Sequence, residues 1–175
     1  GNILVPFLKT VESKPESLAL WIDDIPLSYG ELWAASVPVA RCLTEILHHH
    51  RIESVGVIAD RSITSFVSII ASLAAGIPYV PIHHKYPVKR QISILKQAEC
   101  SVLILGPTST SVIEKLLPKI TNSVSILSIG GDDIDKNIAV TCQHRLIPVK
   151  TATGRHPKIN DNRAACLLFT SGSTG

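Results

Sequence analysis

The sequence comprises 175 residues, of which 45% are hydrophobic and 18% are charged. This composition suits one domain with a real apolar core, and it argues against a disordered or fibrous chain. The net charge of +3 is too small to indicate nucleic acid or a membrane surface as a partner. The charge is uneven, because residues 1–60 hold four basic and eight acidic side chains, whereas residues 61–175 hold 13 and six.

The chain contains no methionine and begins with Gly1, which predicts that it was trimmed at the front or cut from something longer. Its cysteines show no CxxC spacing, which argues against structural zinc and, more weakly, favours buried free thiols in a reducing compartment. No signal-peptide pattern is visible at the N-terminus. These features predict a cytoplasmic location. The cysteines are Cys42, Cys100, Cys142 and Cys166.

One segment is long enough to test as a membrane span. Residues 62–84 carry no formal charge if histidine is neutral, and 23 residues can cross a bilayer as a helix. However, Gly76, Pro78 and Pro81 fall in the second half of the segment. This pattern favours a helix that ends near Gly76 and is followed by a short buried strand.

The first predicted elements are a hairpin and a helix. Two apolar runs, Leu18–Ile22 and Ile25–Leu27, flank two aspartates and predict a β-hairpin with an acidic turn. Ser28-Tyr-Gly-Glu31 has the spacing of a capping box and predicts a helix start. Apolar residues then recur at helical spacing up to Leu47, and Pro38 is expected to bend or divide that helix.

From residue 54, apolar strands alternate with helices. The predicted strands are Val55–Ala59, Tyr79–Ile82, Val102–Leu105, Val124–Ile129 and Ala164–Phe169, and the predicted helices are Thr64–Ala75, Val88–Ala98 and Ser111–Ile120. Strands that are apolar on both faces and alternate with helices indicate an α/β fold, with a mainly parallel sheet and helices on both faces. The pattern fades after Gly130, and the basic residues from Arg145 to Arg163 predict a solvated loop.

The chain ends in glycine and hydroxyl residues directly after a predicted buried strand. Glycines let a backbone approach an anion closely, and Ser and Thr hydroxyls add donors, so this chemistry suits a phosphate-binding loop. On composition alone, such a run is more often a flexible linker. The segment is not a Walker loop, since it lacks the lysine of that motif. The residues are Thr170, Ser171, Gly172, Ser173, Thr174 and Gly175.

Three segments, in order, resemble the adenylate-forming superfamily of acyl-CoA synthetases, luciferases and peptide-synthetase adenylation domains. LSYGEL at Leu27–Leu32 is similar to the family's L-[ST]-Y-x-E-L. LAAGIPYVPIHHKYPVKR at Leu73–Arg90 is similar to L-K-A-G-x-x-Y-V-P-[IL]-D-P-x-x-P-x-x-R. LLFTSGSTG at Leu167–Gly175 matches the start of the phosphate-loop motif [FY]-T-S-G-[ST]-T-G-x-P-K-G. Together they cover almost the whole chain.

The resemblance implies that residues 1–175 are the N-terminal part of the large domain of such an enzyme, an AMP-binding domain truncated inside the phosphate loop. It further implies that the parent protein uses ATP and Mg²⁺ to convert a carboxylic acid into an acyl-adenylate. The acyl group would then pass to a thiol of CoA or phosphopantetheine. Thr170–Gly175 would hold the ATP phosphates through backbone and hydroxyl donors. No catalytic residue and no metal ligand is expected within the fragment, which should be inactive alone.

Tyr79-Val-Pro-Ile82 leans toward the amino-acid-activating branch of the superfamily. The sequence resembles peptide-synthetase adenylation domains and the β-alanine-activating or aminoadipate-semialdehyde-dehydrogenase-like enzymes. The implied partners are a small carboxylic or amino acid and a carrier domain in the same parent chain, without nucleic acid or membrane.

His83-His84 departs from the family pattern, because Asp-Pro is common at these positions. An exposed turn without a ligand role is the expectation for this pair. His48-His49-His50 is likewise expected at an exposed helix C-terminus, and Gly130–Asp133 as a plain loop. An alternative interpretation of the whole chain is a degenerate, non-catalytic nucleotide-binding or scaffold domain of the same fold.

Overall fold

The computed structural model describes residues 3–107, 110–129 and 144–149. In chain order the elements are α1 (Leu4–Ser13), β1 (Leu18–Ile22), β2 (Ile25–Ser28), α2 (Tyr29–His49), β3 (Ser54–Ala59), α3 (Ile63–Ala74), β4 (Tyr79–His83), α4 (Val88–Gln97), β5 (Cys100–Leu105), α5 (Thr110–Lys115), the 3-10 helix η1 (Leu117–Lys119), β6 (Ser125–Ile129) and β7 (Arg145–Val149). Strands and helices therefore alternate from β3 to β6, which confirms the predicted α/β class.

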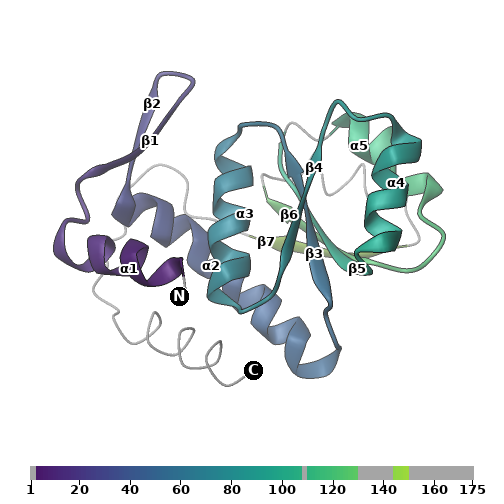
Figure 1. Cartoon of the computed structure of the whole chain (residues 1–175), viewed down its shortest axis with the longest axis horizontal. Coiled ribbons are helices and arrows are strands. Elements are labelled where there is room, and N and C mark those ends of the chain that lie inside the picture. The colour runs from purple at the N-terminus through teal and green to yellow at the C-terminus, as the bar shows by residue number, and fades with distance from the viewer. Residues whose placement is uncertain (1–2, 108–109, 130–143, 150–175) are drawn as a thin grey trace.

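The first two strands form the predicted hairpin, which projects from the body of the molecule (Figure 1). Its turn residues Asp23 and Asp24 have φ values of 49° and 60°. Positive φ at both central residues is the type I′ geometry that matches the twist of a two-residue hairpin, and aspartate tolerates it. Trp21 and Ile25 are exposed on this hairpin.

The main sheet contains five strands in the order β4-β3-β5-β6-β7, and every neighbouring pair is parallel. The helices α2 and α3 lie on one side of this sheet, and α4 and α5 lie on the other (Figure 1). This arrangement confirms the prediction of a parallel sheet covered by helices on both faces.

Alternate residues of one strand belong to different halves of the core. Val102 and Ile104 of β5 join the apolar cluster under α2 and α3, whereas Leu103 and Leu105 join the cluster with α4, α5 and η1. This division follows from the twofold periodicity of a strand. It also explains why β5 is an almost continuous apolar run in the sequence.

The helix α2 begins with the predicted capping box. The Glu31 backbone N–H donates to Ser28 Oγ at 3.1 Å, and the Ser28 N–H donates to Glu31 Oε1 at 3.2 Å. The helix continues without a break through Pro38, so of the two predicted effects of this proline, a bend or a division, the division is wrong. Val39 and Leu43, which follow the proline, are fully buried, and this tertiary packing supports the helix where a hydrogen bond is lost.

Three other elements differ from the predictions. The helix α1 was not expected, and Pro6 is accepted because it lies in the first turn, where N–H groups have no intrahelical partner. The predicted helix Ser111–Ile120 is divided into α5 and η1, and Pro118 lies within η1. Arg145, predicted to lie in a loop, begins the strand β7. This strand is at the sheet edge in the described topology, where Pro148 is tolerated.

The histidine run lies where the sequence predicts, and of the two described cysteines Cys100 is buried as expected while Cys42 is half-buried. His48, His49 and His50 lie at the exposed end of α2. Cys42 and Cys100 are free thiols, while the other two cysteines and Gly130–Asp133 lie outside the described residues. In the part of the chain that the structure describes, no helix has both the length and the apolar character to cross a membrane.

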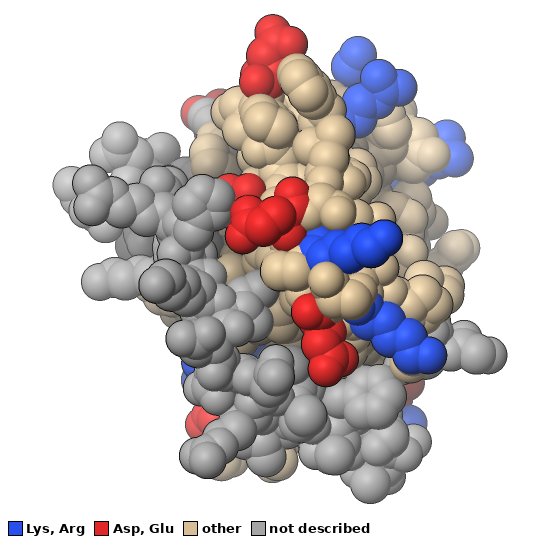
Figure 2. Space-filling view, turned by 90° about the vertical axis from the view of Figure 1, so that its left-hand side faces the viewer, with Lys and Arg blue, Asp and Glu red and all other residues tan. Residues whose placement is uncertain are grey.

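Charged side chains are spread over the surface in small groups. On the face shown in Figure 2, acidic and basic side chains lie near one another in small groups, and uncharged surface surrounds these groups. No broad patch of one sign covers the described part of this face. This distribution agrees with the small net charge.

Candidate functional site

The predicted phosphate loop, Thr170–Gly175, and the strand expected before it lie outside the described residues. Its assignment as the site for the ATP phosphates therefore stays a prediction. The described residues form the parallel sheet, and the edge where its strands end is where a ligand is expected. Ligands of open α/β sheets bind at that carboxyl edge.

The strand order places a topological switch point beside β3. From β3 the chain crosses to β4 on one side, and it then returns past β3 to form β5 on the other side. The connection that leaves β3 and the connection that leaves its neighbour β5 run in opposite directions. Where two such connections separate, at the carboxyl ends of the strands, they make the usual ligand crevice. In this chain the crevice would lie next to Ala59 and Leu105, the last residues of β3 and β5.

The turn after β3 is organised by one carboxylate. Asp60 Oδ1 accepts from the Ser62 N–H at 2.9 Å and from the Ser65 hydroxyl at 2.9 Å. The Ser65 hydroxyl lies 3.0 Å from the Ile58 carbonyl and 3.3 Å from the Asp60 N–H. Ser62 also caps α3. These bonds support Arg61, whose φ of 60° lies in the left-handed region that non-glycine residues rarely adopt.

Gly106, directly after β5, is closely packed against the start of α3. A Cβ added to Gly106, directly after β5, would lie 2.6–2.8 Å from Oγ1, Cγ2 and Cβ of Thr64. Because real Cβ atoms keep a greater distance, only glycine allows β5 and the start of α3 to approach this closely. Thr64 therefore packs directly against Gly106 at the carboxyl end of β5.

The two histidines after β4 form an ordered, exposed turn. The His84 N–H and Nδ1 lie 3.3 and 3.0 Å from the Ala59 carbonyl, and His83 Nδ1 accepts from the Lys85 N–H at 3.1 Å. The two rings stack with centroids 4.9 Å apart. The guanidinium of Arg90 lies 3.9 Å from the centre of the Tyr86 ring, which is a cation–π contact. This geometry confirms the predicted exposed turn.

Contacts within the chain occupy the Nδ1 atoms of both rings. His83 Nδ1 is an acceptor, so the neutral ring of His83 carries its proton on Nε2. His84 Nδ1 faces a carbonyl and is the protonated nitrogen of the neutral ring. Across the described residues, no group of three or more histidine, cysteine, aspartate or glutamate side chains could hold a metal ion.

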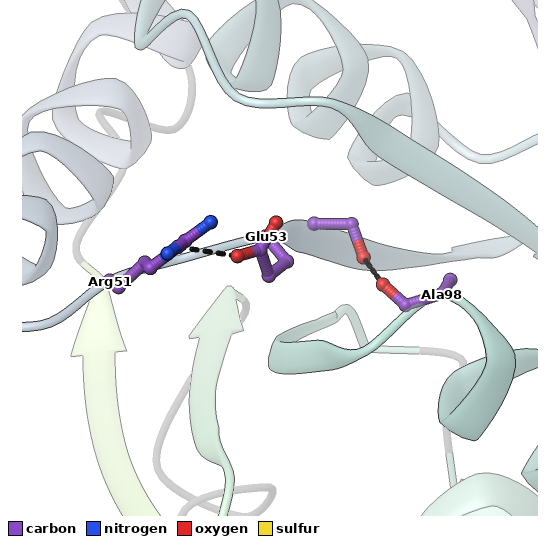
Figure 3. A network of polar contacts seen from close by, with 4 residues as sticks. Arg51, Glu53 and Ala98 are labelled. Carbon is purple, nitrogen blue, oxygen red and sulfur yellow. Dashed lines mark hydrogen bonds and ion pairs between the residues drawn. The ribbon is translucent and has the colours of Figure 1, made fainter.

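The opposite, amino-terminal edge of the sheet has a different polar network (Figure 3). The Ser54 hydroxyl donates to the Ala98 carbonyl at 2.6 Å and lies 3.1 Å from Cys100 Sγ. Burial raises the pKa of the Cys100 thiol, and the hydrogen bond with Ser54 opposes this shift. A raised pKa leaves less thiolate at neutral pH, so Cys100 is unsuited to act as a nucleophile.

Sequence reasoning missed Asp60, Ser65 and Gly106. A polar Asp-Arg-Ser segment directly after a buried strand was a usable signal, since such residues satisfy backbone groups at helix starts. Gly106 occupies the equivalent place after β5, where a glycine commonly marks a close backbone approach. These residues build the carboxyl edge of the sheet.

Comparison with known proteins assigns this chain to a family. The family model for AMP-binding enzymes matches residues 7–175. Apicidin F synthase of Gibberella fujikuroi is 29% identical over 93% of this chain, and a linear gramicidin synthase of Brevibacillus parabrevis is 29% identical over 97%. The chain spans only 3% and 2% of the lengths of these two relatives.

A solved structure agrees with the fold. The Vibrio cholerae adenylation domain AlmE, in complex with glycyl-adenosine-5′-phosphate, superposes with a TM-score of 0.74 at 16% identity. The match covers 93% of this chain and 28% of AlmE. The parallel sheet, the helices on its two faces and the match over residues 7–175 together show that this chain belongs to the family of AMP-binding, adenylate-forming enzymes.

Proposed function

We propose that the protein containing this chain is an ATP-dependent carboxylate-activating ligase. A carboxylate oxygen attacks the α-phosphorus of ATP, pyrophosphate leaves, and an acyl- or aminoacyl-adenylate remains. A thiol of CoA or phosphopantetheine then attacks the acyl carbon and releases AMP. The observation that carries the proposal is the family match, which extends over residues 7–175 and so includes Thr170–Gly175.

An amino acid is the substrate class that we favour. The structural neighbour AlmE holds an aminoacyl-adenylate, and the gramicidin and apicidin F synthases are relatives over nearly the whole chain. A carrier domain in the same parent protein would then supply the phosphopantetheine thiol. Binding of Mg²⁺ with the ATP phosphates and a cytoplasmic location remain predictions.

Within this proposal, Thr170–Gly175 donate hydrogen bonds to the phosphates. Donors that are fixed before reaction stabilise the charge that develops on phosphate oxygens without further reorganisation. The described residues contribute rigidity, because the sheet and the turns at its carboxyl edge are internally hydrogen-bonded. Residues 1–175 alone are expected to be inactive.

Carboxylate-dependent exchange of labelled pyrophosphate into ATP tests the proposal. The assay uses the protein with the residues that follow Gly175, and a panel of amino acids and aliphatic acids. We expect exchange with at least one acid and none with residues 1–175 alone. Replacing Thr174 by valine should reduce exchange by about 100-fold, in line with the loss of one positioned donor.

Thr121→Val is a matched control, because Thr121 is exposed and lies before β6. It should leave exchange unchanged. ATP binding without exchange for any acid would favour the alternative, a degenerate nucleotide-binding domain of the same fold. Exchange by residues 1–175 alone would contradict the expected inactivity of the fragment.

A further inference from the structure

The helix α3 arranges its polar and apolar residues in the reverse of the usual order for a surface helix. Ser65, Ser68 and Ser72 are buried, whereas Phe66 is exposed and Ile69 is only partly buried. A helix on a protein surface normally buries an apolar stripe and turns polar or charged residues to water. The outward side of α3 is therefore the unusual one.

The inner side of α3 is complete within the described residues, where the helix packs with α2 on one face of the sheet (Figure 1). The Ser68 and Ser72 hydroxyls donate to the carbonyls of Thr64 and Ser68, at 2.6 and 2.7 Å. Val67 and Ala71 belong to the core cluster under α2 and α3. Because these groups are already paired or packed, the inner side needs no further partner.

Five apolar residues on the other side of the helix form what we call the outer stripe. All five remain in contact with solvent, and they recur three or four residues apart, which places them along one side of a helix. Phe66 and Ile69 belong to neither core cluster of the described residues. No residue of α3 carries a charge. The outer stripe consists of Ile63, Phe66, Ile69, Ile70 and Leu73.

A helix that has no charged side and is apolar on its outer side is typical of the interior of a larger folded unit. The adenylation domain AlmE matches 93% of this chain, but the match covers only 28% of AlmE. A domain of that size has ample chain beyond residues 1–175 to cover α3. We propose that the outer stripe is an interface inside the parent domain, covered by a segment that follows Gly175. This proposal rests on the family and not on the proposed reaction.

The absence of charge distinguishes a tethered segment from other occupants. Separate partner proteins are steered and oriented by charges around a contact, and a helix that lies on a membrane surface carries Lys or Arg beside its apolar face. No charged residue lies in α3 for either purpose. A segment of the same chain needs no steering, because its linker gives it a high effective concentration. Permanent interfaces are also the more apolar ones.

Thiol alkylation tests whether the outer stripe is covered. Cysteine replaces Phe66 and, as the matched control, Trp21, which is exposed on the hairpin. Both variants are made in the protein with the residues that follow Gly175 and in residues 1–175 alone, and peptide mass spectrometry follows each site. In the longer protein, Phe66→Cys should react at least about tenfold more slowly than Trp21→Cys, because alkylation requires access to the thiol. In residues 1–175 alone, the two rates should lie within about threefold.

A second variant guards against a loss of folding. Circular dichroism is recorded for each variant before alkylation. If Phe66→Cys is unfolded in the longer protein, Ile69→Cys carries the same expectation, because it is a smaller change in volume within the outer stripe.

A charge in the outer stripe should destabilise only the longer protein. Phe66→Lys places an ammonium group where we expect an apolar contact, so it should lower the melting temperature of the longer protein by several degrees. In residues 1–175 alone the same change replaces an exposed ring and should leave the melting temperature unchanged. Trp21→Lys, on the exposed hairpin, should leave both proteins unchanged.

Equal alkylation rates at the two sites in the longer protein, or an unchanged melting temperature for Phe66→Lys there, would overturn the proposal. Protection of position 66 that rises with the concentration of residues 1–175 alone would assign the outer stripe to a second copy and overturn it too. Sedimentation velocity at the same concentrations identifies such a dimer. The proposed function can fail separately, since absence of pyrophosphate exchange with position 66 protected would count against the reaction alone.

Discussion

The two edges of the parallel sheet differ in how they are packed. At the carboxyl edge, Asp60 holds its turn through hydrogen bonds, and Gly106 allows Thr64 to pack closely against the end of β5. At the amino-terminal edge, the sheet opens into a pocket, and the Ser101 hydroxyl next to it has no partner among the described residues. Each edge also holds one buried hydroxyl without a partner among the described residues, Ser128 near the end of β6 and Ser101 near the start of β5, so the edges differ in packing rather than in unpaired polar groups.

This difference teaches that the two edges of one sheet can be packed to different degrees. Open α/β sheets usually bind ligands at the switch point of the carboxyl edge, and here a threonine side chain packs closely against Gly106 at that edge. In this chain the predicted nucleotide contacts come from Thr170–Gly175, beyond the described strands. Substitutions at the two edges should therefore differ in their effects, most strongly where the backbone is closely packed.

The largest effect is expected from Gly106→Ala at the close-packed edge. The new Cβ would meet Thr64, including the Cβ of that residue, at 2.6–2.8 Å. Since a Cβ cannot rotate away, the backbone must shift, and we expect a loss of about 3 kcal/mol in the free energy of unfolding. Urea unfolding monitored by circular dichroism measures this loss in the free energy of unfolding.

Gly56→Ala is the matched comparison on β3. Its Cβ would lie 3.0 and 3.1 Å from the terminal methyl groups of Leu103 and Leu95, which also line the pocket. These flexible ends can move, so the loss should stay near about 1 kcal/mol. An equal loss in both variants would contradict the difference in packing between the edges. Thr64→Gly should restore part of the stability lost in Gly106→Ala.

The next effect concerns the turn after β3. Asp60→Ala removes the acceptor of the Ser62 N–H and the Ser65 hydroxyl, and we expect a loss of about 2 kcal/mol. Asp60→Asn keeps an amide oxygen at that position and should lose less. Thermal or urea unfolding of both variants provides the measurement. A loss in Asp60→Ala no greater than in Asp60→Asn would show that the acceptor does not hold the turn.

Replacing each of two serines at the amino-terminal edge by alanine should change the free energy of unfolding by different amounts. Ser54→Ala removes the 2.6 Å hydrogen bond to the Ala98 carbonyl and should lower the free energy of unfolding by about 1 kcal/mol. Ser101→Ala removes a hydroxyl that has no partner in the described structure, and stability should stay the same or rise. Urea unfolding of both variants makes the comparison. A similar loss in both would show that Ser101 is already satisfied in solution.

The smallest effect concerns the Cys42 thiol in α2. Burial, and secondarily the carboxylate of Glu45, raises the pKa of this thiol. A raised pKa reduces the thiolate fraction below the folded pKa, so alkylation at pH 8 should be slower than for an exposed thiol. Glu45→Gln should lower the pKa of Cys42 and speed its alkylation about twofold, as measured by mass spectrometry of the Cys42 peptide. A slower reaction in Glu45→Gln would contradict this electrostatic effect.

Local sequence signals predicted most of the described fold. The hairpin, the capping box of α2 and the strands from β3 to β6 all follow from periodicity and turn chemistry. The edge strand β7 was missed because Arg145 and Pro148 break the apolar pattern, and only pairing with β6 makes it a strand. The uninterrupted passage of α2 through Pro38 depends on tertiary packing, which no local pattern reveals.

The candidate site was predictable to a smaller extent. The phosphate-loop residues were identified by their resemblance to a family motif, and their position stays a prediction. The close packing at the carboxyl edge depends on the proximity of Gly106 to Thr64, residues 42 positions apart in the sequence. The pocket near Ser101 depends on how α4 and the segment before β6 pack on β5. Such long-range proximity requires the folded chain.

The most direct test of the central claim follows the oxygen atoms of the acid. The protein with the residues after Gly175 is incubated with ATP, a thiol acceptor and a carboxylate labelled with ¹⁸O, and the AMP is examined by mass spectrometry. Attack of the carboxylate on the α-phosphorus predicts one ¹⁸O atom in each AMP released. AMP without label, or label in inorganic phosphate instead, would contradict an adenylate-forming reaction.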